Sequence, residues 1–184
     1  MNDVLKGKIN GFLEAVALIN SSFDLNVGYG FYFEEIESNG EICKSISEHI
    51  LSEYRNYLVA NKRKEDKELL NNLENNFSLL KVFNWDLFLK EGLADWFLST
   101  PLKNYQSYER TVIHKRVYDS LNITTSEFIN LIKEFFDKDE EFEVWEFDEY
   151  FKNSLFYFWG GLRYLDYVFT CKEKVFILHL DVID

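Results

Sequence analysis

The sequence predicts an α+β fold: a mainly helical single domain with a C-terminal antiparallel β-hairpin and one candidate strand near the N-terminus. Two observations predict this class. Apolar residues recur at helical spacing through most of the chain, and the last part changes to the alternating period of strands. A length of 184 residues suits one globular domain, residues 1–184. We therefore expect helices on one side of a small antiparallel sheet.

The N-terminal region is expected to form a helix, a strand and a second helix. Residues 8–20 place apolar side chains near helical spacing, and residues 29–37 begin with the alternating aromatic residues of a strand. The Asn-Gly turn at 39–40 leaves two continuations. An amphipathic helix over residues 42–59 is one, and a hairpin closing onto residues 41–47, with the helix starting later, is the other.

The middle of the chain is expected to be helical. Asn84 is placed to cap one helix, which the Thr100-Pro101 step would end. A preceding helix is predicted from four apolar residues that share one face, Leu69, Leu73, Phe77 and Leu80.

Capping signals predict two further helix starts. Residues 108–122 form a helical pattern, and Thr124 with Glu127 fits the capping box of a new helix behind it. Asp148 is placed to cap a short aromatic helix that ends at the glycine pair 160–161.

The C-terminal part is expected to form the hairpin. Residues 162–170 and 174–183 both alternate as strands do. The last strand presents one apolar face, formed by Phe176, Leu178, Leu180 and Val182.

The chain is strongly acidic. It carries 32 Asp and Glu against 20 Lys and Arg, a formal net charge of -12 at pH 7. Direct binding of nucleic acid needs a dominating positive surface, so small basic clusters at residues 62–67 and 110–116 are better explained as solvated helix faces.

Cysteine usage and hydropathy favour a cytoplasmic protein. Cys43 and Cys171 form no paired motif, and we expect both to be reduced thiols. The N-terminus has no apolar signal segment, and no apolar run reaches the length of a membrane-spanning helix.

Motifs for cofactors and covalent catalysis are lacking. The Gly28-Tyr29-Gly30 step has no third glycine, because Phe33 stands where a dinucleotide-binding turn would need one. Neither a phosphate-binding loop nor a nucleophile elbow occurs. We therefore assign no catalytic residue and no cofactor.

Three histidines, His49, His114 and His179, are the only candidates for metal ligands of that type. His49 with Glu53 could share a helix face, and His179 with Asp181 could share a strand face. Two-residue pairs of this kind arise often by chance, so surface contacts between histidine and carboxylate are the simplest interpretation. We assign no metal site.

An acidic segment, residues 137–149, is the most unusual local feature. It carries a net charge of -7 and is interleaved with large aromatic residues. One interpretation is a solvated acidic face whose aromatic residues point into the core. The other is a surface for a basic partner, with contacts from Asp137, Asp139, Glu140, Glu141, Glu143, Trp145, Glu146, Asp148 and Glu149.

These features favour an acidic protein-binding inhibitor, in the manner of an immunity protein or antitoxin that neutralises a basic toxin such as a nuclease. The first alternative is an enzyme whose site is assembled in a cleft from dispersed residues, with His49, His114, His179 and Asp181 as candidates. The second is a structural or regulatory homo-oligomer that uses the C-terminal hairpin as an edge.

Overall fold

The computed structural model describes residues 3–23, 27–94, 96–97, 111–136, 141–148, 151 and 161–183. Five strands form one antiparallel sheet in the order β1-β5-β4-β3-β2, so the predicted α+β class is confirmed. The elements follow one another as α1 (Asp3–Phe23), β1 (Gly28–Ile36), α2 (Ile42–Asn61), α3 (Lys67–Asn75), β2 (Leu79–Lys81), α4 (Trp85–Ala94), α6 (Thr111–Phe135), β3 (Glu143–Phe147), β4 (Gly161–Cys171) and β5 (Lys174–Ile183).

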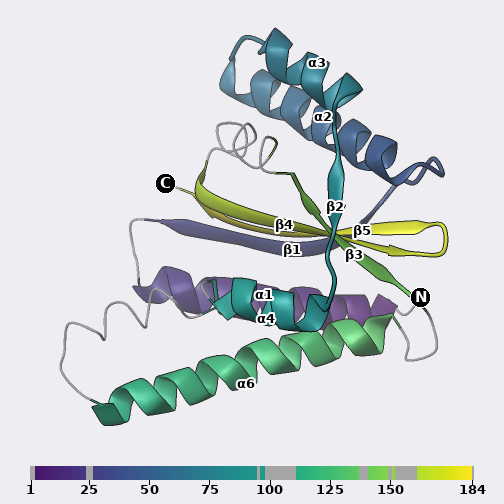
Figure 1. Ribbon diagram of the computed structural model, residues 1–184. Coiled ribbons are helices and arrows are strands. Elements are labelled where there is room, and N and C mark those ends of the chain that lie inside the picture. The colour runs from purple at the N-terminus through teal and green to yellow at the C-terminus, as the bar shows by residue number, and fades with distance from the viewer. Residues whose placement is uncertain are drawn as a thin grey trace.

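Helices cover both faces of the sheet. In the view of Figure 1, α1, α4 and α6 lie below the sheet, and α2 and α3 lie above it. The expectation of helices on one side only is therefore wrong. The physical reason lies in β5, where Val175 and Ile177 alternate with the predicted apolar face and are themselves buried. A strand that is apolar on both sides needs a cover on both sides.

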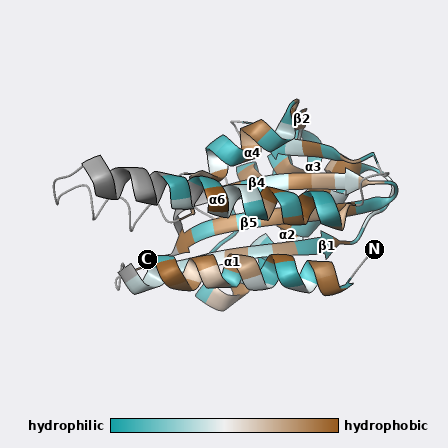
Figure 2. Ribbon diagram, turned by 90° about the horizontal axis from the view of Figure 1, so that it is seen from below, coloured by the Kyte–Doolittle hydropathy of each residue, from teal (hydrophilic) through white to brown (hydrophobic). Residues whose placement is uncertain are grey.

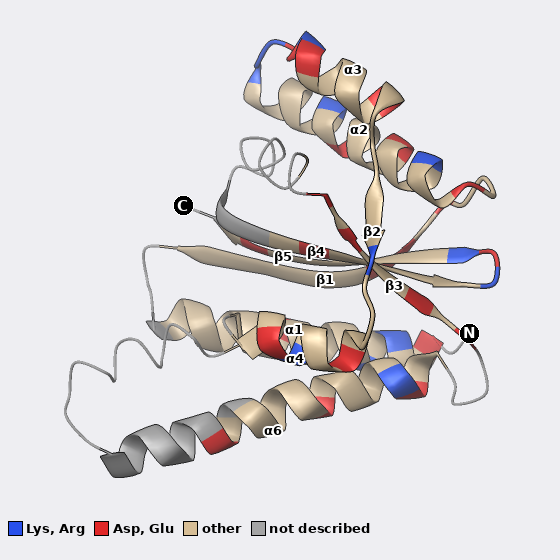
Figure 3. Cartoon of the chain, viewed as in Figure 1, with Lys and Arg blue, Asp and Glu red and all other residues tan. Residues whose placement is uncertain are grey.

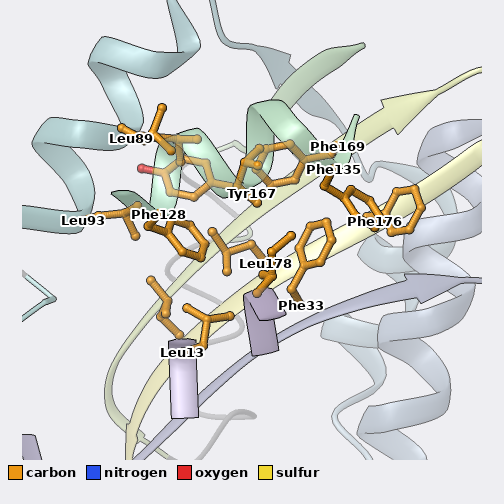
Figure 4. Close-up of a cluster of buried hydrophobic side chains, with 14 of the residues drawn as sticks. Leu13, Phe33, Leu89, Leu93, Phe128, Phe135, Tyr167, Phe169, Phe176 and Leu178 are labelled. Atoms are coloured by element: carbon orange, nitrogen blue, oxygen red, sulfur yellow. The ribbon is translucent and has the colours of Figure 1, made fainter. Parts of the chain in front are cut away.

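The lower core is aromatic. Phe176, Leu178 and Leu180 of β5 point into it, as predicted, together with Phe33 of β1 and Phe169 of β4 (Figure 4). The rings of Phe33 and Phe176 stack with centroids 5.4 Å apart. Such aromatic pairs add about 0.5–1.5 kcal/mol each beyond the apolar area that they bury.

The helices of the lower layer contribute apolar stripes to this core. Viewed from below, α1 carries polar and apolar residues along its length (Figure 2). Its buried side chains recur at helical spacing, and they are Leu5, Ile9, Leu13, Val16 and Ala17.

The upper layer is a pair of helices joined by a capped turn. Helix α2 begins at Ile42, so the alternative hairpin over residues 41–47 is wrong. Asp66 caps α3 by accepting hydrogen bonds from the backbone N–H groups of Glu68 and Leu69. The Asp66 N–H in turn donates to the Tyr54 hydroxyl of α2 at 2.8 Å, which holds the turn against α2.

Helix α6 is continuous through the predicted capping box. The Thr124 hydroxyl donates to the carbonyl of Ser120, one turn earlier, at 2.8 Å. A threonine that bonds backwards in this way continues a helix instead of starting one. The separate helix start at Thr124 and Glu127 is therefore wrong, and residues 111–135 form a single element.

Two strands were not predicted. Leu80, which was expected on a helix, lies in β2, and the acidic segment contains β3. β2 has only three residues, and β3 pairs in register with β2 and β4. Strands this short carry too few residues to show alternation in the sequence.

Helix starts at Asn84 and Asp148 follow the prediction in part. The Asn84 carbonyl accepts from the N–H groups of Leu87 and Phe88, but Asn84 has a positive φ of 52°, unlike a standard N-cap. Asp148 accepts from the backbone N–H of Phe151 at 3.0 Å. The rest of that predicted helix, and the predicted stop at 100–101, lie outside the described residues.

The free edge of β1 is blocked by a side chain from α1. The Asn10 amide donates to the carbonyl of Phe33 and accepts from its N–H, both at 2.8 Å. Asn10 thus takes the place of one residue of a neighbouring strand. Occupying backbone groups at an exposed edge discourages pairing with another chain.

We expect Asn10→Leu to lower the free energy of unfolding by about 1–3 kcal/mol, because the N–H of Phe33 loses its partner. Urea unfolding measures the change, and amide exchange at Phe33 should become faster. Asn61→Leu is the matched control, since Asn61 also bonds a carbonyl but is exposed on α2. Equal effects of the two substitutions would contradict the role given to Asn10.

We expect Leu178→Asp to destabilise the protein by at least about 3 kcal/mol, because it buries an unpaired charge in the aromatic core. Thermal or urea unfolding measures this. Leu18→Asp, at a residue of α1 that is 64% exposed, should change stability by no more than about 0.5 kcal/mol. Wild-type stability of the Leu178 variant would show that the side chain is not in the core.

Candidate functional site

A group of polar side chains lies buried on the upper face of the sheet. Cross-strand register places Asp166 of β4 opposite His179 of β5, and His179 opposite Tyr32 of β1. Their strand neighbours Phe31, Leu178 and Tyr167 point into the lower core. The period of two therefore directs these three polar side chains together toward the α2 side.

His179 is held between two carboxylates. Its Nδ1 lies 2.6 Å from Asp166 Oδ1, and its Nε2 lies 3.6 Å from Asp181 Oδ2. The side chains of His179, Asp166 and Asp181 are 2%, 1% and 10% exposed, respectively. The Tyr32 ring covers the imidazole, with ring centroids 4.8 Å apart. We call Asp166, His179 and Asp181 the buried polar group.

Gly30 makes room for one member of this group. Gly30 lies opposite Asp181 on β1, and a Cβ at this position would overlap the Asp181 carboxylate. A larger residue would force the carboxylate or the strand to move. The second glycine of the sequence step 28–30 thus accommodates a neighbouring side chain.

The two carboxylates keep His179 protonated. Burial alone would lower the pKa of His179, but the charges and hydrogen bonds of Asp166 and then Asp181 outweigh it and raise the pKa to about 9. Burial, and next the Asp166 charge, raise the pKa of Tyr32, which stays a neutral phenol. Two carboxylates against one imidazolium leave the group with a net negative charge.

Two oxygens of this group lack partners among the described residues. Asp166 Oδ2 and Asp181 Oδ1 are buried without a hydrogen bond. Burying a charged oxygen in this way costs free energy unless a donor approaches it. The imidazolium offsets part of that cost. Removing any one member of the buried polar group should therefore lower the free energy of unfolding.

The sequence predicted the His179–Asp181 pair but misjudged its surroundings. The two residues do lie on one side of the strand, yet they are buried, so a surface contact is wrong for them. Asp166 was missed, because its approach to His179 depends on the register of β4 against β5. The alternation of Asp166 with the buried Tyr167 was the available signal.

The remaining candidates do not join this group. His49 Nε2 lies 3.4 Å from Glu34 Oε1 of β1, at a histidine whose side chain is 18% exposed. The side chain of His114 lies outside the described part of the chain. Cys43 is exposed and Cys171 is buried. Within the described ranges, no three His, Cys, Asp or Glu residues are arranged to hold a metal ion.

The acidic segment is divided between core, sheet and surface. Glu143 forms an ion pair with Lys81 of β2, and Asp148 accepts from the Ser78 hydroxyl as well as from Phe151. These carboxylates therefore have partners within the fold.

Other members of the segment differ in exposure. The Trp145 indole N–H donates to the Thr170 hydroxyl at 3.1 Å. Glu146 is half-buried beside Tyr167, and burial, followed by the charge of Glu146, raises the pKa of the Tyr167 hydroxyl. Glu141 is exposed. The predicted contacts Asp137, Asp139, Glu140 and Glu149 lie outside the described residues.

Acidic residues lie at one end of the sheet, beside the β4–β5 hairpin turn, which itself carries Lys172, Glu173 and Lys174 (Figure 3). Glu35 of β1 pairs with Phe176 and Glu143 of β3 pairs with Thr170, so both lie beside this turn. Three strand spacings separate β1 from β3, which amounts to about 15 Å. We call this region the acidic end, formed by Glu35, Glu37, Glu41, Glu141, Glu143 and Glu173.

Four carboxylates of the acidic end have no ion-pair partner in the described part of the chain. Glu35 is paired with Lys174 and Glu143 with Lys81. The other four, all exposed, are Glu37, Glu41, Glu141 and Glu173.

Comparisons with known proteins do not identify the chain. No protein-family model matches it, and no curated protein matches it. Among solved structures it is similar to a crystal structure of citrus MAF1, at 12% identity over 97% of this chain and 98% of that chain, with a TM-score of 0.38. The α+β class of the chain rests on its own helices and antiparallel sheet. None of the described helices is both long and apolar enough to cross a membrane.

The buried polar group predicts a pH-dependent stability. Because the pKa of His179 is raised from its ordinary value near 6.5 to about 9, its stabilisation is complete below about pH 6.5 and is lost as the pH rises through about 9. We expect the free energy of unfolding to fall by up to about 3 kcal/mol over this window. Urea unfolding at each pH measures the slope.

Asp166→Asn should remove most of that slope, because it removes the negative charge that contributes most to raising the pKa of His179. His49→Gln is the matched control and should keep the slope of the wild type. An NMR titration showing a neutral His179 ring at pH 7 would contradict the assignment, as would equal slopes in the wild type and in Asp166→Asn.

Proposed function

We propose that the chain is a stoichiometric protein-binding inhibitor, in the manner of an immunity protein or antitoxin that neutralises a basic toxin in the cytoplasm. The observation that carries the proposal is the acidic end of the sheet. Its four unpaired carboxylates come from three connections of the chain and converge around one hairpin turn. A basic surface, such as the substrate cleft of a nuclease, is the partner that this charge would attract.

The local distribution of charge supports a surface built for a partner. Residues 28–41 contain four glutamates and no lysine or arginine, and residues 141–148 contain four acidic residues and no basic one. In contrast, helix α1 carries two lysines against one aspartate and one glutamate. The excess of acid is therefore concentrated where β1 and β3 approach the hairpin turn.

The mechanism would be occlusion without turnover. Carboxylates at the acidic end would accelerate the encounter with a basic partner, because opposite charges raise association rates by about 10–1,000-fold. At physiological ionic strength this attraction extends only about 8 Å, so a stable complex also needs close contact. The predicted contact Trp145 is half-buried, and the predicted contact Glu141, at the start of the same segment, is exposed.

The enzyme alternative is weaker on the geometry of its candidate residues. His179 and Asp181 do meet, as that alternative required. The His179 and Asp166 side chains are almost completely buried, however, which leaves a substrate no route to them in this conformation. The oligomer alternative required the hairpin to form an edge, and that is wrong, because β4 and β5 each have a strand on both sides.

Reversing the charge of the acidic end should weaken binding. We expect the triple variant Glu37→Lys, Glu141→Lys and Glu173→Lys to lose at least about tenfold in affinity at low salt and most of its salt dependence. The partner is first retained from a lysate of the source cells and identified by mass spectrometry. Its affinity for each variant is then measured by biolayer interferometry at low and high salt.

The matched control is Glu14→Lys, Glu65→Lys and Glu127→Lys, which changes the net charge equally at exposed positions outside the acidic end. Co-expression of the wild type should also relieve any toxicity of the retained partner. Unchanged affinity of the first triple variant at low salt would refute the acidic end as the interface. A retained partner whose toxicity is not relieved would refute the inhibitor function.

A further inference from the structure

A polar groove runs between α4 and α6 on the lower layer. It has a volume of about 250 Å³. Its floor is the buried Ile129, and the two helices pack beneath it through side chains that include Leu89 and Phe128 (Figure 4). The walls combine charged and neutral polar groups, namely Asp86, Leu87 and Lys90 from α4 and Ser126, Asn130 and Lys133 from α6.

One positive charge in the groove is uncompensated. Lys133 bonds Asp86 at 3.0 Å, and this hydrogen bond lowers the pKa of Asp86, so the two charges neutralise each other. Lys90 has no ion-pair partner in the described ranges. The Ser126 hydroxyl and the Asn130 amide likewise form no hydrogen bond there. Three donors therefore face an open groove in a protein of net charge -12.

Exposed apolar side chains occur in and shortly before α4, and one of them, Leu87, lines the groove. Nine large hydrophobic residues of the described chain are exposed, and four of them fall within residues 80–88. These four residues are Leu80, Phe83, Leu87 and Phe88. Leu87 is 57% exposed, so the groove offers one apolar contact beside its polar walls.

We propose that this groove, together with the exposed Leu87 on its wall, binds a segment of a protein partner that carries a carboxylate beside bulky apolar side chains. Lys90, Asn130 and Ser126 would donate to the carboxylate, and Leu87 would pack against the apolar side chains. An amphipathic helix laid into a groove between two helices is a recurrent form of this recognition. The charge preference is opposite to that of the acidic end, so this site is independent of the proposed inhibitor function.

The probe for this site is a fluorescein-labelled amphipathic helical peptide with leucines along one face and glutamates beside them. Its isomer has lysines in place of the glutamates. Fluorescence anisotropy against the full chain should show binding of the glutamate peptide and binding at least about tenfold weaker for the lysine isomer.

Two variants with matched controls locate the site. Lys90→Glu should weaken binding of the glutamate peptide about tenfold, whereas Lys44→Glu, the same change on the exposed face of α2, should not. Leu87→Ser should also weaken it, whereas Val59→Ser, at an exposed apolar residue of α2, should not. In the unaltered protein, backbone NMR shifts caused by the peptide should centre on Leu87, Ser126 and Asn130.

The inference is overturned if the glutamate peptide does not bind, or if both isomers bind equally. It is also overturned if the groove variants behave like their controls, or if the NMR shifts fall elsewhere. A wild-type mass that doubles with concentration, and returns to the monomer in Leu87→Ser, would mean that a second copy covers Leu87, and would equally overturn the inference.

Discussion

The arrangement of the molecule depends on β5 being buried on both of its faces. β5 bonds β1 on one side and β4 on the other, and it lies between two helical layers. One face is wholly apolar and anchors the aromatic core. The other begins with Val175 and Ile177 and continues with His179 and Asp181. A shift of one residue in the pairing of β5 would point His179 toward the aromatic core. The polar half of β5 therefore also specifies the register of the strand.

The buried polar group and the two surface regions suit different tasks. The buried group is shielded from solvent and internally paired, which suits a part that specifies structure, as some buried ionic groups do. The acidic end is exposed and partly unpaired, and so can exchange water for a partner. The segment that we propose for the groove between α4 and α6 is acidic, whereas the partner that we propose for the acidic end is basic. Together, the two proposals describe a chain that could hold two different segments of protein at once.

Strong periodicity made most of the long elements predictable. α1, α2, β1 and the hairpin follow from spacing alone, and their ends differ from the expected ends by a few residues. The sequence could not reveal that Thr124 would bond Ser120, because the same residues satisfy a capping box. Residues 79–81 and 143–147 become strands (β2 and β3) mainly because they pair with neighbouring strands. Of the buried polar group, the spacing of His179 and Asp181 was visible, but Asp166 joins them only through cross-strand register.

A side chain at position 30 would overlap the Asp181 carboxylate of the neighbouring strand, and this has an evolutionary consequence. A carboxylate at 181 demands the absence of a side chain at 30, and a side chain at 30 demands a shorter residue at 181. Substitutions at the two positions should therefore be inherited together. A relative that keeps the aspartate at 181 should also keep the glycine at 30, whatever its overall identity to this chain.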